Sequence, residues 1–176
     1  KRGLAEMKTK AEAFFEGLAG KRVAFIGAGV SHRELLPLFA KRGAVVTLCD
    51  KKGSVEEFGP LGEELRALGV RFSLGQGYLD GLRGQDMILR TPGFEYFTPA
   101  LQQALAQGAE VTSEMELFFE LCPCKIYAVT GSDGKTTSTT LIAEMLRAEG
   151  KTVHLGGNLG RALLPVVDTV RPGDVA

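Results

Sequence analysis

The chain has 176 residues, and 21 Lys and Arg are balanced by 21 Asp and Glu, so its formal net charge is zero. Nucleic-acid binding by phosphate neutralisation needs a basic surplus or stripe, so we expect no nucleic-acid partner. With 44% hydrophobic and 24% charged residues, the composition is that of a globular protein. No apolar run reaches the roughly 18 residues of a membrane span, and no signal-peptide core is present, so we expect no membrane partner.

Three cysteines, Cys49, Cys122 and Cys124, form a small and odd-numbered set. Only Pro123 separates the last two, and both histidines are distant in sequence, so the spacing does not favour a zinc site. Reduced thiols in a cytoplasmic protein are the simpler interpretation. The sequence assigns no role to Cys122 and Cys124.

The first part of the chain alternates short apolar runs with amphipathic segments. Ser-x-x-Glu capping boxes at Ser31 and Ser54, and the pair Thr98-Pro99, mark expected helix starts. The expected helices span 3–18, 31–42, 54–69 and 98–107, and the expected strands span 23–26, 44–49, 70–74, 87–89 and 110–112. Each crossover is long enough to return the chain, which predicts an α/β domain with a parallel five-stranded sheet over residues 1–112.

A second α/β unit is expected over residues 113–176. A third capping box at Ser113 opens a short helix to about 121, followed by a strand at 125–129, a helix at 135–148 and a strand at 152–155. The last residues are typical of a turn into another strand. A domain that ends at its third strand cannot close a core, so we expect this unit to be incomplete.

The strongest motif is VTGSDGKTT at residues 129–137, between an apolar strand and a helical pattern. Such a loop directs backbone N–H groups at one point, and the helix N-terminus adds partial positive charge. Lys135 can then reach the β- and γ-phosphates of ATP, and the Thr136 hydroxyl can ligate Mg²⁺. Val129 replaces the first glycine of the usual P-loop, so this loop is a variant; the alternative is a glycine turn with a chance Lys-Thr-Thr. The expected ATP-binding residues are Gly131, Ser132, Asp133, Gly134, Lys135, Thr136 and Thr137.

A second candidate site follows the first two strands. Gly27-Ala28-Gly29 and Asp50 have the spacing of a dinucleotide fingerprint, but His32 stands where its third glycine should be, which disfavours NAD. Asp50 can accept hydrogen bonds from a ribose or a base. Alternatively, Ser31 is only a helix cap and Asp50 only a strand-end residue.

Two further loops are compatible with ligand binding. Thr91-Pro92-Gly93 follows the fourth strand at its carboxyl end, where open α/β sheets bind ligands, although a plain turn explains it equally well. Gly156-Gly157-Asn158 has the same status. His154 is expected to pack rather than to act in catalysis.

Together these segments resemble the Mur ligase family, the ATP-dependent amide ligases of peptidoglycan precursor synthesis. The resemblance is carried by VTGSDGKTTSTTLIAEML at 129–146, GGNLG at 156–160, SEMELF at 113–118, RTPG at 90–93, and VAFIGAGVS at 23–31 with Asp50. It implies a Rossmann-like first domain that binds a UDP-linked substrate and the start of a P-loop ATPase domain. The member that adds D-glutamate is the best match.

The resemblance implies that ATP with Mg²⁺ phosphorylates the carboxylate of UDP-linked muramoyl-L-alanine, and that the amine of D-glutamate attacks the acyl phosphate. Lys135 and Thr136 would be the catalytic residues, with Thr136 on the metal and the remaining ligands beyond residue 176. The implied UDP-substrate site comprises Gly29, Val30, Ser31, Asp50, Lys51, Thr91, Pro92, Gly93 and Asn158. The alternatives are a family member that adds another amino acid, such as L-alanine, and a non-catalytic module that senses NAD or a UDP-sugar. The chain alone is expected to be inactive.

Overall fold

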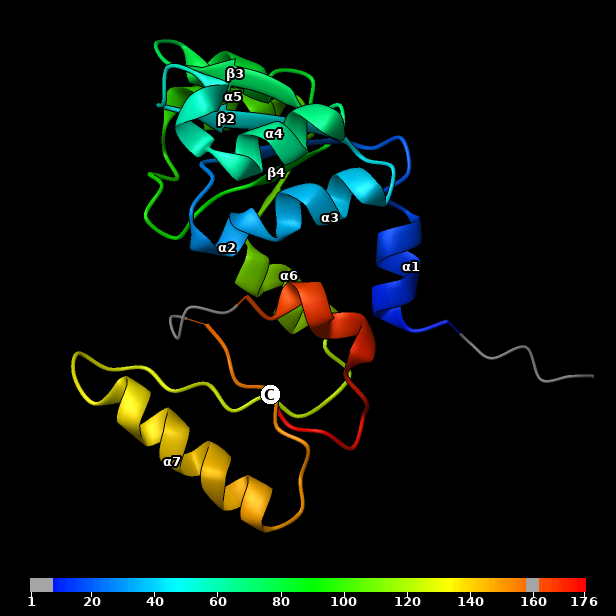
Figure 1. Ribbon diagram of the computed structural model, residues 1–176, viewed down its shortest axis with the longest axis vertical. Helices are drawn as coiled ribbons and strands as arrows, with labels where there is room; N and C mark the ends of the chain where they lie inside the picture. The colour runs from blue at the N-terminus through cyan, green and yellow to red at the C-terminus, as the bar shows by residue number, and fades with distance from the viewer. Residues whose placement is uncertain (1–7, 158–161) are drawn as a thin grey trace, which may run out of the picture.

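The computed structural model describes residues 8–157 and 162–176. Its main body contains one sheet of five parallel strands (Figure 1). The strands are β1 (Arg22–Ile26), β2 (Val45–Asp50), β3 (Arg71–Leu74), β4 (Met87–Leu89) and β5 (Glu110–Thr112). Their order is β3-β2-β1-β4-β5. The predicted α/β class and the five-stranded parallel sheet are therefore confirmed.

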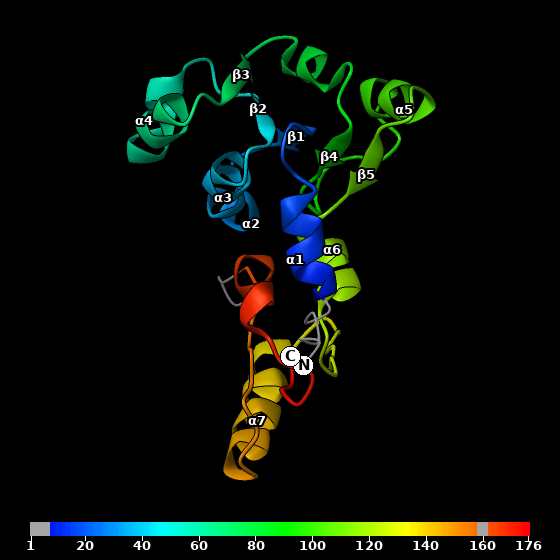
Figure 2. The same cartoon turned by 90° about the vertical axis from the view of Figure 1, so that its right-hand side faces the viewer.

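Helices cover both faces of this sheet, because successive side chains of each strand point to opposite faces. On one face, Val23 and Phe25 of β1 pack in a cluster with α3 (Leu35–Lys41) and α4 (Pro60–Ala67). On the other, Ala24 and Ile26 pack beneath α5 (Pro99–Ala106) and the 3₁₀ helix Tyr78–Leu82. Figure 2 shows α3 and α4 on the side of the sheet opposite α5.

The first helix is shorter than the sequence predicted. α1 spans Lys10–Glu16, and residues 8 and 9 precede it without helical structure; residues 3–7 lie outside the described residues. A capping box that the sequence analysis missed begins it: Thr9 Oγ1 accepts from the Glu12 amide at 3.1 Å, and Glu12 Oε2 accepts from the Thr9 amide at 2.8 Å. This reciprocal pair satisfies two N–H groups that would otherwise lack partners.

The predicted helix 31–42 is two helices, α2 (Val30–Arg33) and α3, with a break at Glu34. The predicted capping box at Ser31 is wrong, because Gly29 is the N-cap and Ser31 lies within α2. At the predicted helix 54–69 the Ser54 box does form, but it opens the 3₁₀ helix Val55–Phe58, and α4 begins only after Gly59.

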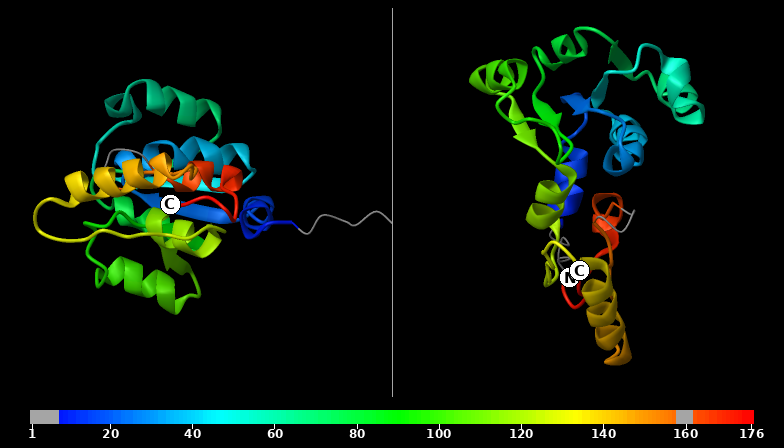
Figure 3. Two further views of the ribbon diagram at one scale, coloured as in Figure 1. Left: turned by 90° about the horizontal axis from the view of Figure 1, so that it is seen from below. Right: turned by 90° about the vertical axis from the view of Figure 1, so that its left-hand side faces the viewer.

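The second part of the chain holds α6 (Glu114–Leu121) and α7 (Lys135–Ala148), both close to their predicted bounds. The predicted strands 125–129 and 152–155 reduce to single parallel bridges, from Lys125 and from Val153 to Val175. The last residues of the chain thus lie between the segment at Lys125 and the segment at Val153. Figure 3 shows α7 outside the main body and away from the five-stranded sheet.

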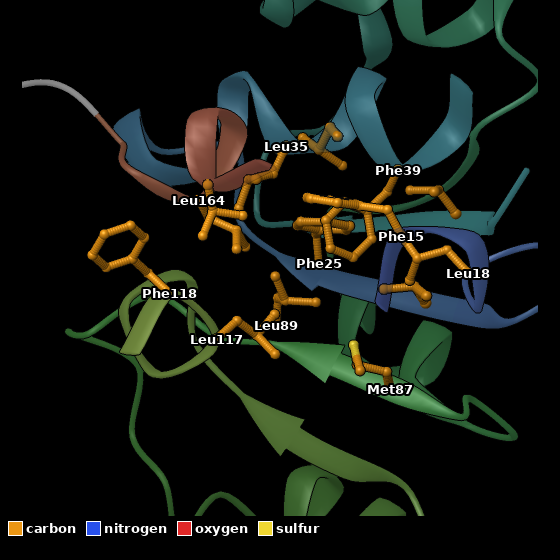
Figure 4. Packing of buried hydrophobic residues seen from close by; sticks show 14 of the residues in the cluster. Phe15, Leu18, Phe25, Leu35, Phe39, Met87, Leu89, Leu117, Phe118 and Leu164 are labelled. Carbon is orange, nitrogen blue, oxygen red and sulfur yellow. The ribbon is translucent and has the colours of Figure 1, made fainter. Parts of the chain in front are cut away.

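A 3₁₀ helix over Leu164–Thr169, which the sequence analysis did not predict, returns to the first part of the chain. Its contacts are with α1, α3 and α6. Leu164 joins Phe15, Phe39 and Phe118 in the larger apolar cluster (Figure 4). This cluster therefore contains residues from both sides of the boundary expected near 112, which itself stays a prediction.

A buried carboxylate fixes this 3₁₀ helix to α6. Glu114 is 6% exposed, and its Oε1 accepts from the amides of Leu163 and Leu164, both at 2.9 Å. The N-terminal amides of a helix lack intrahelical partners, so Glu114 supplies the cap that the local sequence does not. No helix within residues 8–157 and 162–176 is long and apolar enough to cross a membrane.

Candidate nucleotide-binding site

The carboxyl ends of β1 and β4 are neighbours at the point where the strand order reverses. From β1 the chain proceeds through β2 and β3 on one side, and then crosses to β4 and β5 on the other. Open parallel sheets bind ligands in the crevice at such a point. The loops that leave it are Gly27–Gly29 after β1 and Arg90–Gly93 after β4.

The structure brings Gly27, Asp50 and Thr91 together at this edge. A Cβ placed on Gly27 would lie 3.9 Å from Asp50 Oδ2 and 3.9 Å from Thr91 Cγ2. Gly27 has φ +82°, a conformation that glycine adopts without strain. A Cβ on Gly29 would also lie 3.9 Å from Thr91, whereas Gly93 has no heavy atom within 4 Å of that position.

The Asp50 carboxylate joins two of these loops. Its Oδ2 accepts from the Ala28 amide and its Oδ1 from the Lys52 amide, each at 3.0 Å. A carboxylate has about four acceptor positions, so each oxygen retains capacity for a ligand donor. A cavity of about 310 Å³ opens beside it, lined by Ala28, Gly29, Arg33, Asp50, Lys52, Glu57, Phe58 and Leu61. Lys51 is exposed and does not line this cavity.

His32 is buried beneath the same loop and has a structural role. Its Nδ1 lies 2.7 Å from the Gly27 carbonyl oxygen, and its ring meets the Phe25 ring edge-on at 5.1 Å. Burial lowers the pKa of His32, so the ring is neutral at physiological pH, and Nδ1–H donates because a carbonyl can only accept. The imidazole occupies the place where a dinucleotide fingerprint has its third glycine.

The loop before α7 turns at two glycines with positive φ. Gly131 has φ +155°, and Gly134, the N-cap of α7, has φ +73°. Lys135 Nζ donates to the carbonyl oxygens of Gly131 and Ser132, so the ammonium folds back over its own loop. The first amides of α7 point out of the helix end and can bind phosphate.

These residues fit a magnesium nucleotide. The Thr136 side chain is exposed at the first turn of α7, where a hydroxyl can reach a metal held by phosphate. Within residues 8–157 and 162–176, no three His, Cys, Asp or Glu side chains gather in a metal-binding arrangement. Among the described residues, Thr136 is thus the candidate magnesium ligand, and Mg²⁺ in nucleotide sites also binds phosphate oxygens, water and one or two carboxylates.

One cleft of about 420 Å³ is lined by residues from both candidate sites. Val30 and Ser31 come from α2 and Pro92 from the loop after β4, whereas Lys135 and Thr136 come from the first turn of α7. The predicted residues outside both cavity linings are Lys51, Thr91, Gly93, Gly131, Ser132, Asp133, Gly134 and Thr137. Asn158 lies outside the described residues. Five residues of the two predicted sites therefore line the same cleft.

Arg90 is a cleft residue that the sequence analysis did not single out. Its side chain is 20% exposed, its guanidinium lies 5.6 Å from the centre of the Tyr96 ring, and it reaches Glu116 Oε1 at 3.4 Å. Its Nε is buried and has no hydrogen-bond partner among the described residues. The sequence feature that could have identified Arg90 is its position directly before Thr91-Pro92-Gly93, at the carboxyl end of β4.

His154 also lines the cleft, on the side formed by the last residues of the chain. Its Nε2 lies 2.9 Å from Asp174 Oδ2, and the same oxygen accepts from the Arg171 amide at 2.9 Å. The hydrogen bond from His154 lowers the pKa of Asp174. The sequence had suggested that His154 only packs. In the structure it also has a polar partner at the wall of the cleft.

Taken together, the loops at the switch point and the loop before α7 line one cleft of an α/β protein. Residues 129–169 match the family model of the Mur ligase middle domain. The UDP-N-acetylmuramoylalanine--D-glutamate ligases of Acetivibrio thermocellus and Ruminiclostridium cellulolyticum are 46% and 48% identical to this chain over 168 residues. That alignment covers 96% of this chain and 36% of each relative. Nearly all of this chain is thus similar in sequence to these two ligases, in line with the resemblance that its motifs carry.

The chain spans little more than a third of the length of the curated relatives it matches, at 36% of each. Among solved structures, a murein peptide ligase from Psychrobacter arcticus is 21% identical, with a TM-score of 0.49 over 89% of this chain and 37% of its own.

Proposed function

We propose that this chain supplies the UDP-substrate site and the ATP-binding loop of an ATP-dependent amide ligase of peptidoglycan precursor synthesis. The proposed ligase adds D-glutamate to UDP-N-acetylmuramoyl-L-alanine. The observation that carries the proposal is the single cleft that Ser31 and Pro92 line together with Lys135 and Thr136. A ligase that activates one substrate with ATP needs both binding loops to face one space, because the two reacting groups must meet.

At the UDP end, the proposed ligands are the loops after β1, β2 and β4. Asp50 has remaining acceptor capacity for a uracil N–H or a ribose hydroxyl, and the Gly27–Gly29 loop admits close approach of phosphate. Arg90 supplies a cation whose Nε lacks a hydrogen-bond partner in the described part of the chain. We propose that it pairs with an anionic group of the same substrate, since a guanidinium is well suited to phosphate and carboxylate.

At the ATP end, Lys135 would exchange its two loop carbonyls for phosphate oxygens and stabilise charge during transfer. Mg²⁺, held in part by Thr136, would neutralise phosphate charge when bound. A carboxylate oxygen of the muramoyl-L-alanine attacks the γ-phosphorus and ADP leaves. The amine of D-glutamate then attacks the acyl carbon, loses a proton and displaces phosphate. Both partners are small molecules, and because the reaction consumes ATP we propose that it occurs in the cytoplasm.

Ligand-dependent thermal stabilisation of this chain tests the proposal. UDP-N-acetylmuramoyl-L-alanine should raise the melting temperature, UDP-N-acetylmuramate should raise it less, and NAD should leave it unchanged. Asp50→Asn should reduce the response to the UDP ligand and leave the response to ATP with Mg²⁺, whereas Lys135→Ala should do the reverse. Stabilisation by NAD alone would contradict the ligase proposal and favour a dinucleotide-sensing module. A stronger response to UDP-N-acetylmuramate would favour a family member that adds a different amino acid.

A further inference from the structure

A pair of thiols lies outside the residues that line the cleft. Cys122 caps the end of α6 with φ −66° and ψ 122°, the extended conformation that a residue before proline prefers. The chain turns at Pro123 so that Cys122 Sγ and Cys124 Sγ lie 3.4 Å apart. Both cysteines are free and partly exposed, whereas Cys49 is free and fully buried.

The two sulfur atoms are in non-bonded contact. A disulfide bond is about 2.05 Å long, so the two atoms need to approach by about 1.4 Å more. Both thiols lie in a connecting segment between α6 and the bridge at Lys125, where the backbone belongs to no named helix or strand. A small rotation of either side chain can therefore bring the atoms into bonding distance.

We propose that Cys122 and Cys124 form a redox-active dithiol, which a low-molecular-weight disulfide oxidises reversibly to an intramolecular disulfide. The Cys122 thiolate attacks one sulfur of the oxidant, forming a mixed disulfide and releasing one small thiolate. The Cys124 thiolate then attacks Cys122 Sγ and releases the second small thiolate. Two electrons pass from the cysteines to the oxidant, and the two cysteine protons go to solvent or to the released thiolates.

The raised pKa of Cys124 favours Cys122 as the first thiol to attack. Burial, together with the neighbouring Cys122, raises the pKa of Cys124 to about 12, so Cys124 is a poor first nucleophile. Once Cys122 carries the mixed disulfide, its thiol no longer hydrogen-bonds to Cys124, and one cause of the raised pKa is removed. A ring closed over one intervening residue is strained, and strained disulfides are readily reduced, which makes this a reversible site rather than a structural crosslink.

The location of the dithiol gives its oxidation a structural consequence. Cys124 precedes Lys125, whose carbonyl accepts from the Ala176 amide at 3.0 Å, and Tyr127 donates to the Ala176 carbonyl at 2.8 Å. This short ladder leads into the loop at Gly131. Closing the ring pulls on the first residue of the ladder, so oxidation should alter hydrogen exchange at the Tyr127 and Ala176 amides.

The experiment uses the whole 176-residue chain, fully reduced and then incubated with oxidised glutathione. Thiols are counted after denaturation, and intact mass and peptide mapping identify the product. Two of the three thiols should be lost, with a mass decrease of two hydrogens, a link within the peptide that contains 122–124, and full recovery in dithiothreitol. Cys49→Ser is the matched control and should form the same link.

The single variants separate the two steps. Cys124→Ser should stop at a mixed disulfide on Cys122, and Cys122→Ser should react far more slowly than the native chain. Circular dichroism verifies that each variant folds. The proposal is overturned if the native chain loses no thiols, if it accumulates only mixed disulfides, or if it forms disulfide-linked dimers in place of the internal link. None of these results depends on the proposed ligase function.

Discussion

Removing the carboxylate of Glu114 should separate the 3₁₀ helix Leu164–Thr169 from α6. Glu114 Oε1 accepts two amide hydrogen bonds at 2.9 Å, and the residue is 6% exposed. A hydrogen bond to a charged group contributes about 1.5–3 kcal/mol, so Glu114→Ala removes two such bonds and leaves two amides without a partner. Because water can enter the shortened site, we expect the lower limit, a loss of about 3 kcal/mol in the free energy of unfolding.

Urea unfolding followed by far-ultraviolet circular dichroism measures this loss, since the chain has no Trp. At this chain length, about 3 kcal/mol corresponds to a fall of roughly 6–12 °C in melting temperature. Glu114→Gln keeps one acceptor and should lose about 1 kcal/mol. Glu120→Ala is the control, because Glu120 lies on the same helix with its side chain exposed, and it should change stability by less than about 0.5 kcal/mol.

Hydrogen exchange provides a second, local measurement. The Leu163 and Leu164 amides should lose protection in Glu114→Ala, whereas the sheet amides of β1 should keep theirs. The reasoning is refuted if Glu114→Ala unfolds at the same urea concentration as Glu120→Ala. It is also refuted if the Leu163 and Leu164 amides exchange at the native rate in the variant, because the carboxylate would then not be the cap.

Three further predictions concern single residues of the site. Lys135→Ala should weaken ATP binding about 10- to 150-fold, the equivalent of one charge-assisted hydrogen bond, and calorimetry should find the UDP-substrate affinity unchanged. Arg90→Ala should weaken the UDP-substrate by a similar factor and spare ATP; equal losses for both ligands would contradict its assignment. Because burial lowers the pKa of His32, the unfolded chain binds a proton that the folded chain excludes. The resulting stability is fully present above about pH 6.5 and is lost as the pH falls from there toward the lower folded pKa. His32→Gln should therefore lose less stability than the native chain between about pH 7.5 and 5.5 in urea titrations.

The sheet and the meeting of the loops at the carboxyl ends of its strands could be predicted because their signals are local. Each strand is a short apolar run bounded by turn residues, and parallel strands place their carboxyl ends at one edge. That geometry alone indicated that Gly27 and Asp50 would meet, and their separation in the structure agrees. The start of α7 could be predicted from the sequence in the same way, since Gly134-Lys135 marks the start of a long helix.

The remaining features depend on contacts that no local pattern contains. The 3₁₀ helix at Leu164 has no side-chain cap of its own, and its cap comes from Glu114, 50 residues earlier in the chain. Ser31 matched a capping box, but the extended backbone of Gly29, with φ −66° and ψ 179°, begins α2 two residues sooner. For the 3₁₀ helix the capping group becomes evident only when the fold places Glu114 nearby, whereas for α2 the backbone conformation of Gly29 decides.

The charges of the cleft explain how a chain of zero net charge can be proposed to bind two anionic substrates. A neutral protein has no long-range field to attract them, so recognition depends on the local potential. The Glu114 carboxylate at the cleft is occupied by two amides, whereas Arg90 and Lys135 contribute positive charge from the two loop systems. Each cation belongs to a different loop and is proposed to meet a different ligand. This separation is why the Arg90 and Lys135 variants should affect different affinities, and why a cleft joining both loops suits a reaction between their two substrates.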